Sequence, residues 1–123
     1  MLLDSNIFIY AVQPEYKSLR EWCITQKICA SNITRLEVLG YKKLAKKDKN
    51  DFFRLFEKTK IYPVSSVVIE RAILLRQQKS ISIGDSIIAA TALEYNQILV
   101  TRNISDFEWI DELKVINPIA EKI

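Results

Sequence analysis

The sequence contains no histidine, and this absence narrows the chemistry open to the protein. Serine–histidine and cysteine–histidine catalysis are excluded, and a zinc site lacks its usual nitrogen ligand. The only cysteines, Cys23 and Cys29, are too few to form a zinc site by themselves. We expect two buried apolar thiols rather than a disulfide. Any chemistry must therefore use carboxylates, hydroxyls, amides, lysine or arginine.

Long hydrophobic runs are also missing. The longest uncharged apolar stretch extends from Ser86 to Leu93, far short of the roughly 20 residues that a membrane span needs. The N-terminus carries no basic leader, so we expect no signal peptide and no membrane anchor. With 123 residues, 49% of them hydrophobic, the chain is expected to form a single domain over residues 1–123 that is soluble and cytoplasmic.

Charge is unevenly distributed along the chain, although the formal net charge is only +3. Residues 1–60 carry 12 basic and 7 acidic groups, whereas residues 61–123 carry 6 basic and 8 acidic groups. The densest basic stretch is YKKLAKKDKN, which contains Lys42, Lys43, Lys46, Lys47 and Lys49. These lysines fit two readings. They complement the dipole at a solvated helix C-terminus, or they contact the phosphates of a polyanion.

Strand-like and helix-like segments alternate along the sequence. The pattern predicts a short strand over residues 2–4 that runs into a turn of helix, and helices over residues 14–26, 34–47, 51–60, 65–79 and 84–96. Further extended segments are predicted over residues 27–33, 61–64, 98–101 and 114–118, with a polar turn and a short helix over residues 103–113. Tight two-residue turn signals are almost absent, which favours an α/β fold with a mostly parallel central sheet flanked by helices. Asn96 is expected to end its helix, since asparagine tolerates the left-handed backbone of a C-cap.

Four carboxylates come from separate segments of this predicted fold. Asp4 ends the first strand, Glu37 lies in the first turn of a helix, Asp85 opens a helix, and Asp106 follows a buried strand after a short polar loop. Ligands of such sheets bind outside the carboxyl ends of the strands. We therefore expect these acids to meet at one edge of the sheet.

Each acid also has a structural explanation. Thr34 and Glu37 have the spacing of a capping box at a helix start. Asp85 is favoured near a helix N-terminus by the dipole, and Asp106 can cap a short helix that follows it. Asp4 is the hardest to explain structurally, because no helix cap is obviously required in the first strand.

Clustered carboxylates favour a bound cation. Two of them 5 Å apart repel by roughly 3 kcal/mol at an effective dielectric constant of 20. With oxygen ligands only, the natural ion is magnesium or manganese. A cation held by carboxylates beside a basic flank suits phosphodiester hydrolysis, because it activates water and screens the developing charge.

Segments spread over nearly the whole chain resemble one protein family. LDSNIFIY, SNITRLEVLGY, GDSIIAATALEYNQILVTRNISDF and VINP are similar to the successive motifs of PIN-domain ribonucleases, specifically the VapC toxins of VapBC toxin–antitoxin pairs. The resemblance implies a PIN-like α/β domain with a parallel sheet, an acidic magnesium site, and endonucleolytic cleavage of RNA. Two positions depart from it. Asn96 stands where many relatives have glycine, and Gly84 is expected to make Asp85 less rigid.

The resemblance also assigns the catalytic acids, which by motif position are Asp4, Glu37, Asp85 and Asp106. We expect Asp4 and Asp85 to form the floor of the metal site and Asp106 to complete it. Glu37 is expected to hold or deprotonate the attacking water.

Four polar residues are expected to support these acids through hydrogen bonds: Ser5, Asn6, Thr101 and Asn103. Ser5 and Asn6 orient the site through side chains or amides. For Thr101 and Asn103, plain loop capping is an equally good explanation.

Partners follow from the same resemblance, which implies a cognate antitoxin and a homodimer. An arginine of the antitoxin can pair with the carboxylates and bar the metal. We expect a disordered tail that folds into a groove between amphipathic helices, near Trp22, Phe52, Phe53 and Phe56, although these aromatic residues also fit an ordinary core.

Two other functions remain open. One is a phosphatase or phosphotransfer domain with an aspartate nucleophile, but Asp4-Ser5-Asn6 lacks the second aspartate that such enzymes place two residues later. The other is a nucleic-acid-binding or regulatory module without turnover, which would use the lysine face alone.

Overall fold

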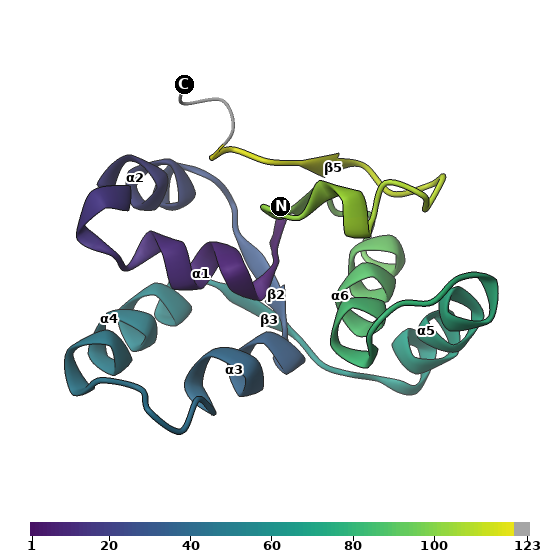
Figure 1. The fold of residues 1–123 in the computed structure, drawn as a ribbon, viewed down its shortest axis with the longest axis horizontal. Helices are drawn as coiled ribbons and strands as arrows, with labels where there is room; N and C mark the ends of the chain where they lie inside the picture. The colour runs from purple at the N-terminus through teal and green to yellow at the C-terminus, as the bar shows by residue number, and fades with distance from the viewer. Residues whose placement is uncertain (120–123) are drawn as a thin grey trace.

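A parallel five-stranded sheet forms the centre of the protein, seen in a computed structural model that describes residues 1–119 (Figure 1). The strands are β1 (Leu2–Leu3), β2 (Cys29–Ser31), β3 (Lys60–Tyr62), β4 (Leu99–Val100) and β5 (Val115–Ile116), in the spatial order β3-β2-β1-β4-β5. Every neighbouring pair is parallel. The predicted α/β class and its parallel sheet are thus confirmed.

Within residues 1–119, six α-helices and two short 3-10 helices connect the strands. The α-helices are α1 (Ser5–Ala11), α2 (Lys17–Thr25), α3 (Asn32–Leu39), α4 (Lys46–Glu57), α5 (Ser66–Gln78) and α6 (Ile83–Glu94); the 3-10 helices are η1 (Pro14–Tyr16) and η2 (Ile104–Asp106). Asn96 adopts the expected left-handed backbone after α6, with φ 52°. No helix among the described residues is long and apolar enough to cross a membrane.

Two hydrophobic clusters lie on opposite faces of the sheet, because successive strand residues point to opposite sides. In three strands the paired neighbours divide between the clusters: Leu2 and Leu3, Cys29 and Ala30, Leu99 and Val100. Buried residues of α5 and α6 complete one cluster, and those of α1, α2 and α4 complete the other. The two groups of helices accordingly lie on opposite sides in Figure 1. The helix α3 packs against both α1 and α6, between the layers.

The lysine-rich stretch has a different structure from the one predicted. The helix α3 ends at Leu39, and α4 begins at Lys46, so the predicted helix over residues 34–47 is wrong. Tyr41 is exposed, which removes the apolar contact that would have continued the helix. Lys46 and Lys47 open a helix instead of closing one, so the C-terminal dipole explanation is also wrong.

The aromatic residues named from the sequence belong largely to the core. Phe52 and Phe56 are buried, and Phe56 stacks on Phe8 with ring centroids 4.6 Å apart. Trp22 packs against the same cluster, whereas Phe53 is exposed. Cys23 and Cys29 are both buried, as expected.

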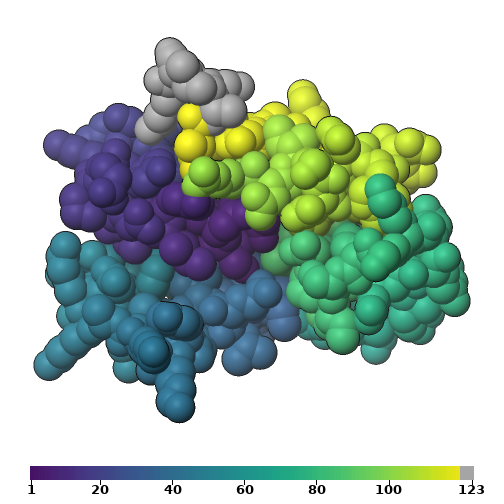
Figure 2. All heavy atoms as spheres, viewed as in Figure 1, coloured from purple at the N-terminus to yellow at the C-terminus, as the bar shows by residue number. Residues whose placement is uncertain are grey.

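The strand order creates a topological switch point beside β1. The chain passes from β1 to β2 and β3 on one side, then returns to place β4 on the other side. Figure 2 shows the purple N-terminal segment near the middle of the visible face, bordered by blue and teal segments from the first half of the chain and by green and yellow segments from the second half. Open α/β sheets bind ligands outside the strand carboxyl ends at such a point, here between β1 and β4.

Candidate acidic site at the carboxyl edge of the sheet

Asp4 lies at this switch point, directly after β1. Its Oδ2 accepts a hydrogen bond of 2.7 Å from the hydroxyl of Thr101, which follows β4. Its Oδ1 accepts from the backbone N–H of Ser5 at 2.8 Å, so Asp4 is also the N-cap of α1. This role as a helix cap was not predicted from the sequence. Both carboxylate oxygens are thus held, and the side chain is 5% exposed.

Burial makes the ionised form of Asp4 unfavourable. It raises the pKa of Asp4 from 3.8 to about 6, and the nearby carboxylates of Asp85 and Glu37 add to the rise. The hydrogen bonds from Thr101 and Ser5 oppose it. A buried acid that is held in place but costly to ionise is suited to receive a cation.

Glu37, on the helix α3, contacts Ser5, the residue that follows Asp4. The Ser5 hydroxyl donates to Glu37 Oε1 at 2.6 Å, and it also lies 3.4 Å from Thr34 Oγ1. The capping-box explanation is wrong, because α3 begins earlier and Ser31 caps it through the Ile33 N–H. Glu37 therefore lies in the second turn of α3, exposed and directed by Ser5.

The start of α6 brings Asp85 beside Glu37. The Ser82 hydroxyl accepts from the Asp85 N–H at 3.1 Å, which caps the helix. A Cβ atom at Gly84 would lie 2.6 Å from Glu37 Oε2. Gly84 therefore makes room for Glu37, and Ser82 caps the helix start that carries Asp85. The lower rigidity expected for Asp85 stays a prediction. The spacing Ser82-x-x-Asp85 is a capping pattern that could have indicated this helix start from the sequence.

Asp85 and Asp106 lie near one another on the other side of the site. Burial raises the pKa of Asp85, the carboxylates of Asp106 and Glu37 raise it further, and the Ser82 hydrogen bond opposes the rise. Asp85 and Asp106 both line a pocket of about 350 Å³. Asp106 ends η2 and is followed by a turn, so it caps no following helix; its carbonyl accepts from the Trp109 indole at 2.9 Å.

The predicted supporting residues form a hydrogen-bonded border around Asp4. Asn6 Nδ2 lies 3.5 Å from Thr101 Oγ1, and Asn6 Oδ1 accepts from the Arg102 N–H at 3.3 Å. The Asn103 backbone N–H donates to the Thr101 hydroxyl at 3.1 Å. Thr101 therefore joins Asp4 to this loop, and Asn103 contributes through its backbone.

The spacing and the ligand atoms of the four acids determine which cation they can bind. Within residues 1–119, no group of three or more acidic, cysteine or histidine side chains is arranged closely enough to hold a metal ion. The acids are nevertheless near enough for Asp85 to raise the pKa of Asp4, and for Asp106 to raise that of Asp85. Magnesium prefers oxygen ligands and keeps several waters when one or two carboxylates bind it. Two neighbouring carboxylates, those of Asp4 and Asp85, provide oxygen ligands of the kind that suit such an ion.

One basic residue, Lys43, lies near Glu37 in the loop between α3 and α4. Lys43 and Glu37 line the same pocket of about 320 Å³, together with Asp48. Phosphate contact by Lys43 stays a prediction.

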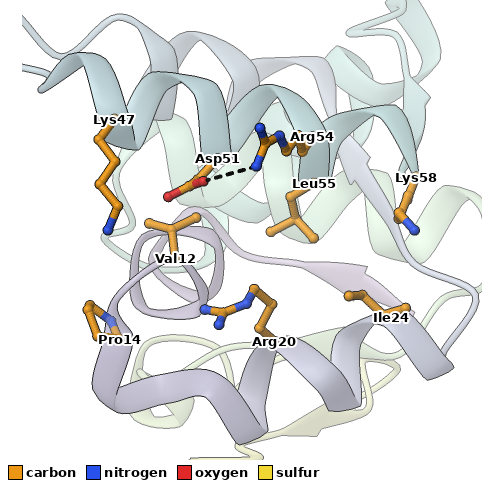
Figure 3. A pocket seen from close by; sticks show the side chains of 9 residues that line it. All are labelled: Val12, Pro14, Arg20, Ile24, Lys47, Asp51, Arg54, Leu55 and Lys58. Atoms are coloured by element: carbon orange, nitrogen blue, oxygen red, sulfur yellow. Dashed lines mark ion pairs between the residues drawn. The ribbon is translucent and has the colours of Figure 1, made fainter.

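A separate groove of about 540 Å³ lies between α2 and α4 (Figure 3). Its lining consists of Val12, Pro14, Arg20, Ile24, Lys47, Asp51, Arg54, Leu55 and Lys58. The apolar part of the lining is aliphatic, and the groove lies between the helices that carry Trp22 and the three phenylalanines. The docking of an antitoxin near these aromatic residues stays a prediction. Four of the lining residues are basic and one is acidic, which makes the groove positively charged.

Comparisons with known proteins agree with this architecture. The profile of the PIN domain family matches residues 1–113. Ribonuclease VapC10 of Mycobacterium tuberculosis is 26% identical, covering 93% of this chain and 90% of that protein. A chain of a toxin–antitoxin complex from Klebsiella pneumoniae is 32% identical, with a TM-score of 0.74, covering 95% of this chain and 96% of that one. A chain of VapBC2 from Rickettsia felis, solved with a promoter DNA fragment, is 26% identical, with a TM-score of 0.78, covering 94% and 96%.

Proposed function

The chain belongs to the PIN-domain family, and from this premise we propose that it is a divalent-metal-dependent endoribonuclease acting as a VapC-type toxin. One observation carries the proposal: Asp4, Glu37, Asp85 and Asp106 approach one another at the switch point of the sheet, where Asp4 and Asp85 have raised pKa values. The ribonuclease name of the M. tuberculosis relative supports RNA as the substrate.

We assign Asp4 and Asp85 to the metal, completed by Asp106, with magnesium or manganese as the ion. When bound, such a cation stabilises negative charge on the phosphate and makes water easier to deprotonate. Thr101 and the Ser5 amide fix both oxygens of Asp4, so its carboxylate needs little reorientation. Ser82 fixes the backbone that carries Asp85.

Glu37 has the properties of a general base. It is exposed to solvent, the Ser5 hydroxyl directs one of its oxygens, and the missing side chain at Gly84 leaves space beside the other. We therefore assign Glu37 to accept a proton from the water that attacks the phosphodiester.

The decisive experiment measures RNA cleavage by the purified protein with magnesium, manganese or EDTA, with single-stranded DNA as a second substrate. We expect cleavage of RNA that EDTA abolishes, and a rate on the order of a thousandfold lower for Asp4→Asn. The matched control Asp111→Asn changes an exposed aspartate outside the site and should cut normally. Binding of RNA without cleavage would indicate a regulatory module, and full activity in metal-free protein would contradict the mechanism.

The positively charged groove between α2 and α4 supports the proposed antitoxin partner. Its aliphatic residues Val12, Ile24 and Leu55 can accept apolar anchors, while Lys47 and Lys58 favour acidic residues in the bound segment (Figure 3). We therefore propose that the tail of a cognate antitoxin folds into this groove and extends an arginine to the acidic site.

The homodimer is also a proposal, supported by an apolar surface on α5. The side chains of Val67, Ile69, Ile73 and Leu74 are exposed, whereas Val68, Ala72 and Leu75 are buried against the core. Pairing two copies through this face would cover the apolar surface. Light scattering should give twice the chain mass for the wild type and less for Leu74→Glu; an unchanged mass would place any contact elsewhere.

A further inference from the structure

Arg102 is fixed beside the acidic site through its backbone. It follows Thr101, whose hydroxyl binds Asp4. Its N–H donates to Asn6 Oδ1 at 3.3 Å, and its carbonyl accepts from Asn117 Nδ2 at 3.2 Å. The position of Arg102 relative to Asp4 is therefore determined on both sides of the residue.

The side chain of Arg102 is held by aromatic residues of α1 and η1. Its Cζ lies 4.7 Å from the ring centroid of Tyr10, and Nη1 donates to the Tyr10 hydroxyl. The Tyr10 ring in turn packs edge-on against Tyr16, with centroids 4.9 Å apart. A cation over an aromatic face is attracted to the ring while its edge stays open to other partners.

The charge of Arg102 is not neutralised by a carboxylate of the described chain. Ion pairs within residues 1–119 join Lys17 to Glu21, Arg54 to Asp51, and Arg71 to Glu94. Arg102 takes part in none of them, although four acids lie in the neighbouring site, and the residue is exposed. A guanidinium has five donors in a planar fork, of which Tyr10 uses one here.

We infer that Arg102 binds a phosphate of the RNA strand next to the one that is cleaved, and that Tyr10 positions it. This inference rests on the proposed ribonuclease function. A polyanion approaching four carboxylates is repelled, and a fixed guanidinium at their border offsets that repulsion. Arginine forks pair with phosphate through two parallel hydrogen bonds. The fixed orientation reduces the conformational entropy lost on binding.

The test compares steady-state kinetics of Arg102→Gln, Arg102→Lys and wild type on one RNA over a series of salt concentrations. Lys114→Gln is the control, because it removes an exposed charge that precedes β5, at the opposite edge of the sheet. For Arg102→Gln we expect KM to rise about tenfold at low salt with kcat nearly unchanged. The slope of log(kcat/KM) against log[salt] should become shallower by about 0.7. Arg102→Lys keeps the positive charge but not the fork, so its salt slope should be close to that of the wild type while its KM stays higher than that of the wild type.

Two results would overturn the inference. In the first, Arg102→Gln has the same KM and the same salt slope as Lys114→Gln. In the second, Arg102→Gln lowers kcat and the melting temperature but changes neither KM nor the salt slope. Either result would show that Arg102 has only a structural role. If the wild type cuts no RNA under any metal condition, the proposed function fails first, and the inference fails with it.

Discussion

The carboxylate of Glu37 occupies the space that a side chain at position 84 would fill. A Cβ atom at Gly84 would lie 2.6 Å from Glu37 Oε2 and 3.4 Å from its Cδ. Gly84 is in the first turn of α6, next to Asp85, whereas Glu37 belongs to α3. The absence of a side chain at position 84 therefore lets the Glu37 carboxylate lie against the start of α6.

Gly84→Ala should therefore impair catalysis without harming the fold. The displaced atoms are the end of an exposed side chain, and alanine favours a helix over glycine by up to about 1 kcal/mol. We expect an equal or higher melting temperature and a rate about a hundredfold lower, similar to that of Glu37→Gln. The double variant should be no slower than Glu37→Gln alone. Additive losses would show that Gly84 acts independently of Glu37.

Asp4 should make the stability of the metal-free protein depend on pH. Its folded pKa of about 6 lies above the ordinary 3.8, so the folded state binds the proton more tightly. The free energy of unfolding should fall as pH rises from about 4 to 6, by up to about 3 kcal/mol from this group. Asp4→Asn removes this dependence, although the amide has one acceptor oxygen and loses one hydrogen bond, worth about 1 kcal/mol.

Urea denaturation in EDTA at several pH values measures this effect. The stability of Asp4→Asn relative to wild type should increase from pH 4 to pH 7. A difference that stays constant over this range would mean that Asp4 ionises freely in the folded protein.

Thr101→Val should weaken metal binding, since the Thr101 hydroxyl orients the Asp4 carboxylate at 2.7 Å. Millimolar magnesium should raise the melting temperature of the wild type by binding the folded state. In Thr101→Val the affinity should fall 10- to 100-fold, with a smaller shift. Thr91→Val is the matched control, because Thr91 is equally buried but bonds only within α6, to the Ile87 carbonyl. If magnesium raises the melting temperatures of both variants equally, Thr101 does not support metal binding. If magnesium does not raise the melting temperature of the wild type, the acids are not clustered.

A negative charge introduced into the groove between α2 and α4 should leave the toxicity of the protein intact but prevent its inhibition by the antitoxin. Ile24 lines the groove and is exposed, so Ile24→Asp should fold and cut RNA normally while binding the antitoxin at least tenfold more weakly. Val64→Asp is the control, because Val64 is exposed between β3 and α5 and belongs neither to this groove nor to the apolar face of α5. In cells that express each variant, co-expression of the cognate antitoxin, which we expect the neighbouring open reading frame to encode, should relieve growth arrest for the control but not for Ile24→Asp. Full relief in both would place the antitoxin on another surface.

Local features of the sequence determined the order of strands and helices. Alternating short apolar runs and helical spacing were enough for the α/β class, and Asn96 ended its helix in the left-handed region as its side chain allows. The missing histidine restricted any metal site to oxygen ligands. These conclusions depend on interactions between residues close in the chain, or on composition alone.

Such local features did not predict where α3 ends and α4 begins, near the lysine-rich stretch. The spacing of apolar residues continued through Tyr41 and Leu44, yet α3 ends at Leu39 because the next residues turn toward α4. Periodicity alone does not show which apolar residues find a surface to cover, and Tyr41 finds none.

What only the tertiary structure decided is how the acids are related in space. The sequence predicted that Asp4, Glu37 and Asp85 meet at one edge of the sheet, but not the contacts that hold them there. Strand order places Thr101 against Asp4, and the packing of α3 on α6 places Glu37 over Gly84. The raised pKa of Asp4 likewise comes mainly from burial under distant segments. Distances between residues far apart in the chain depend on how whole layers pack, and no short stretch of sequence contains that information.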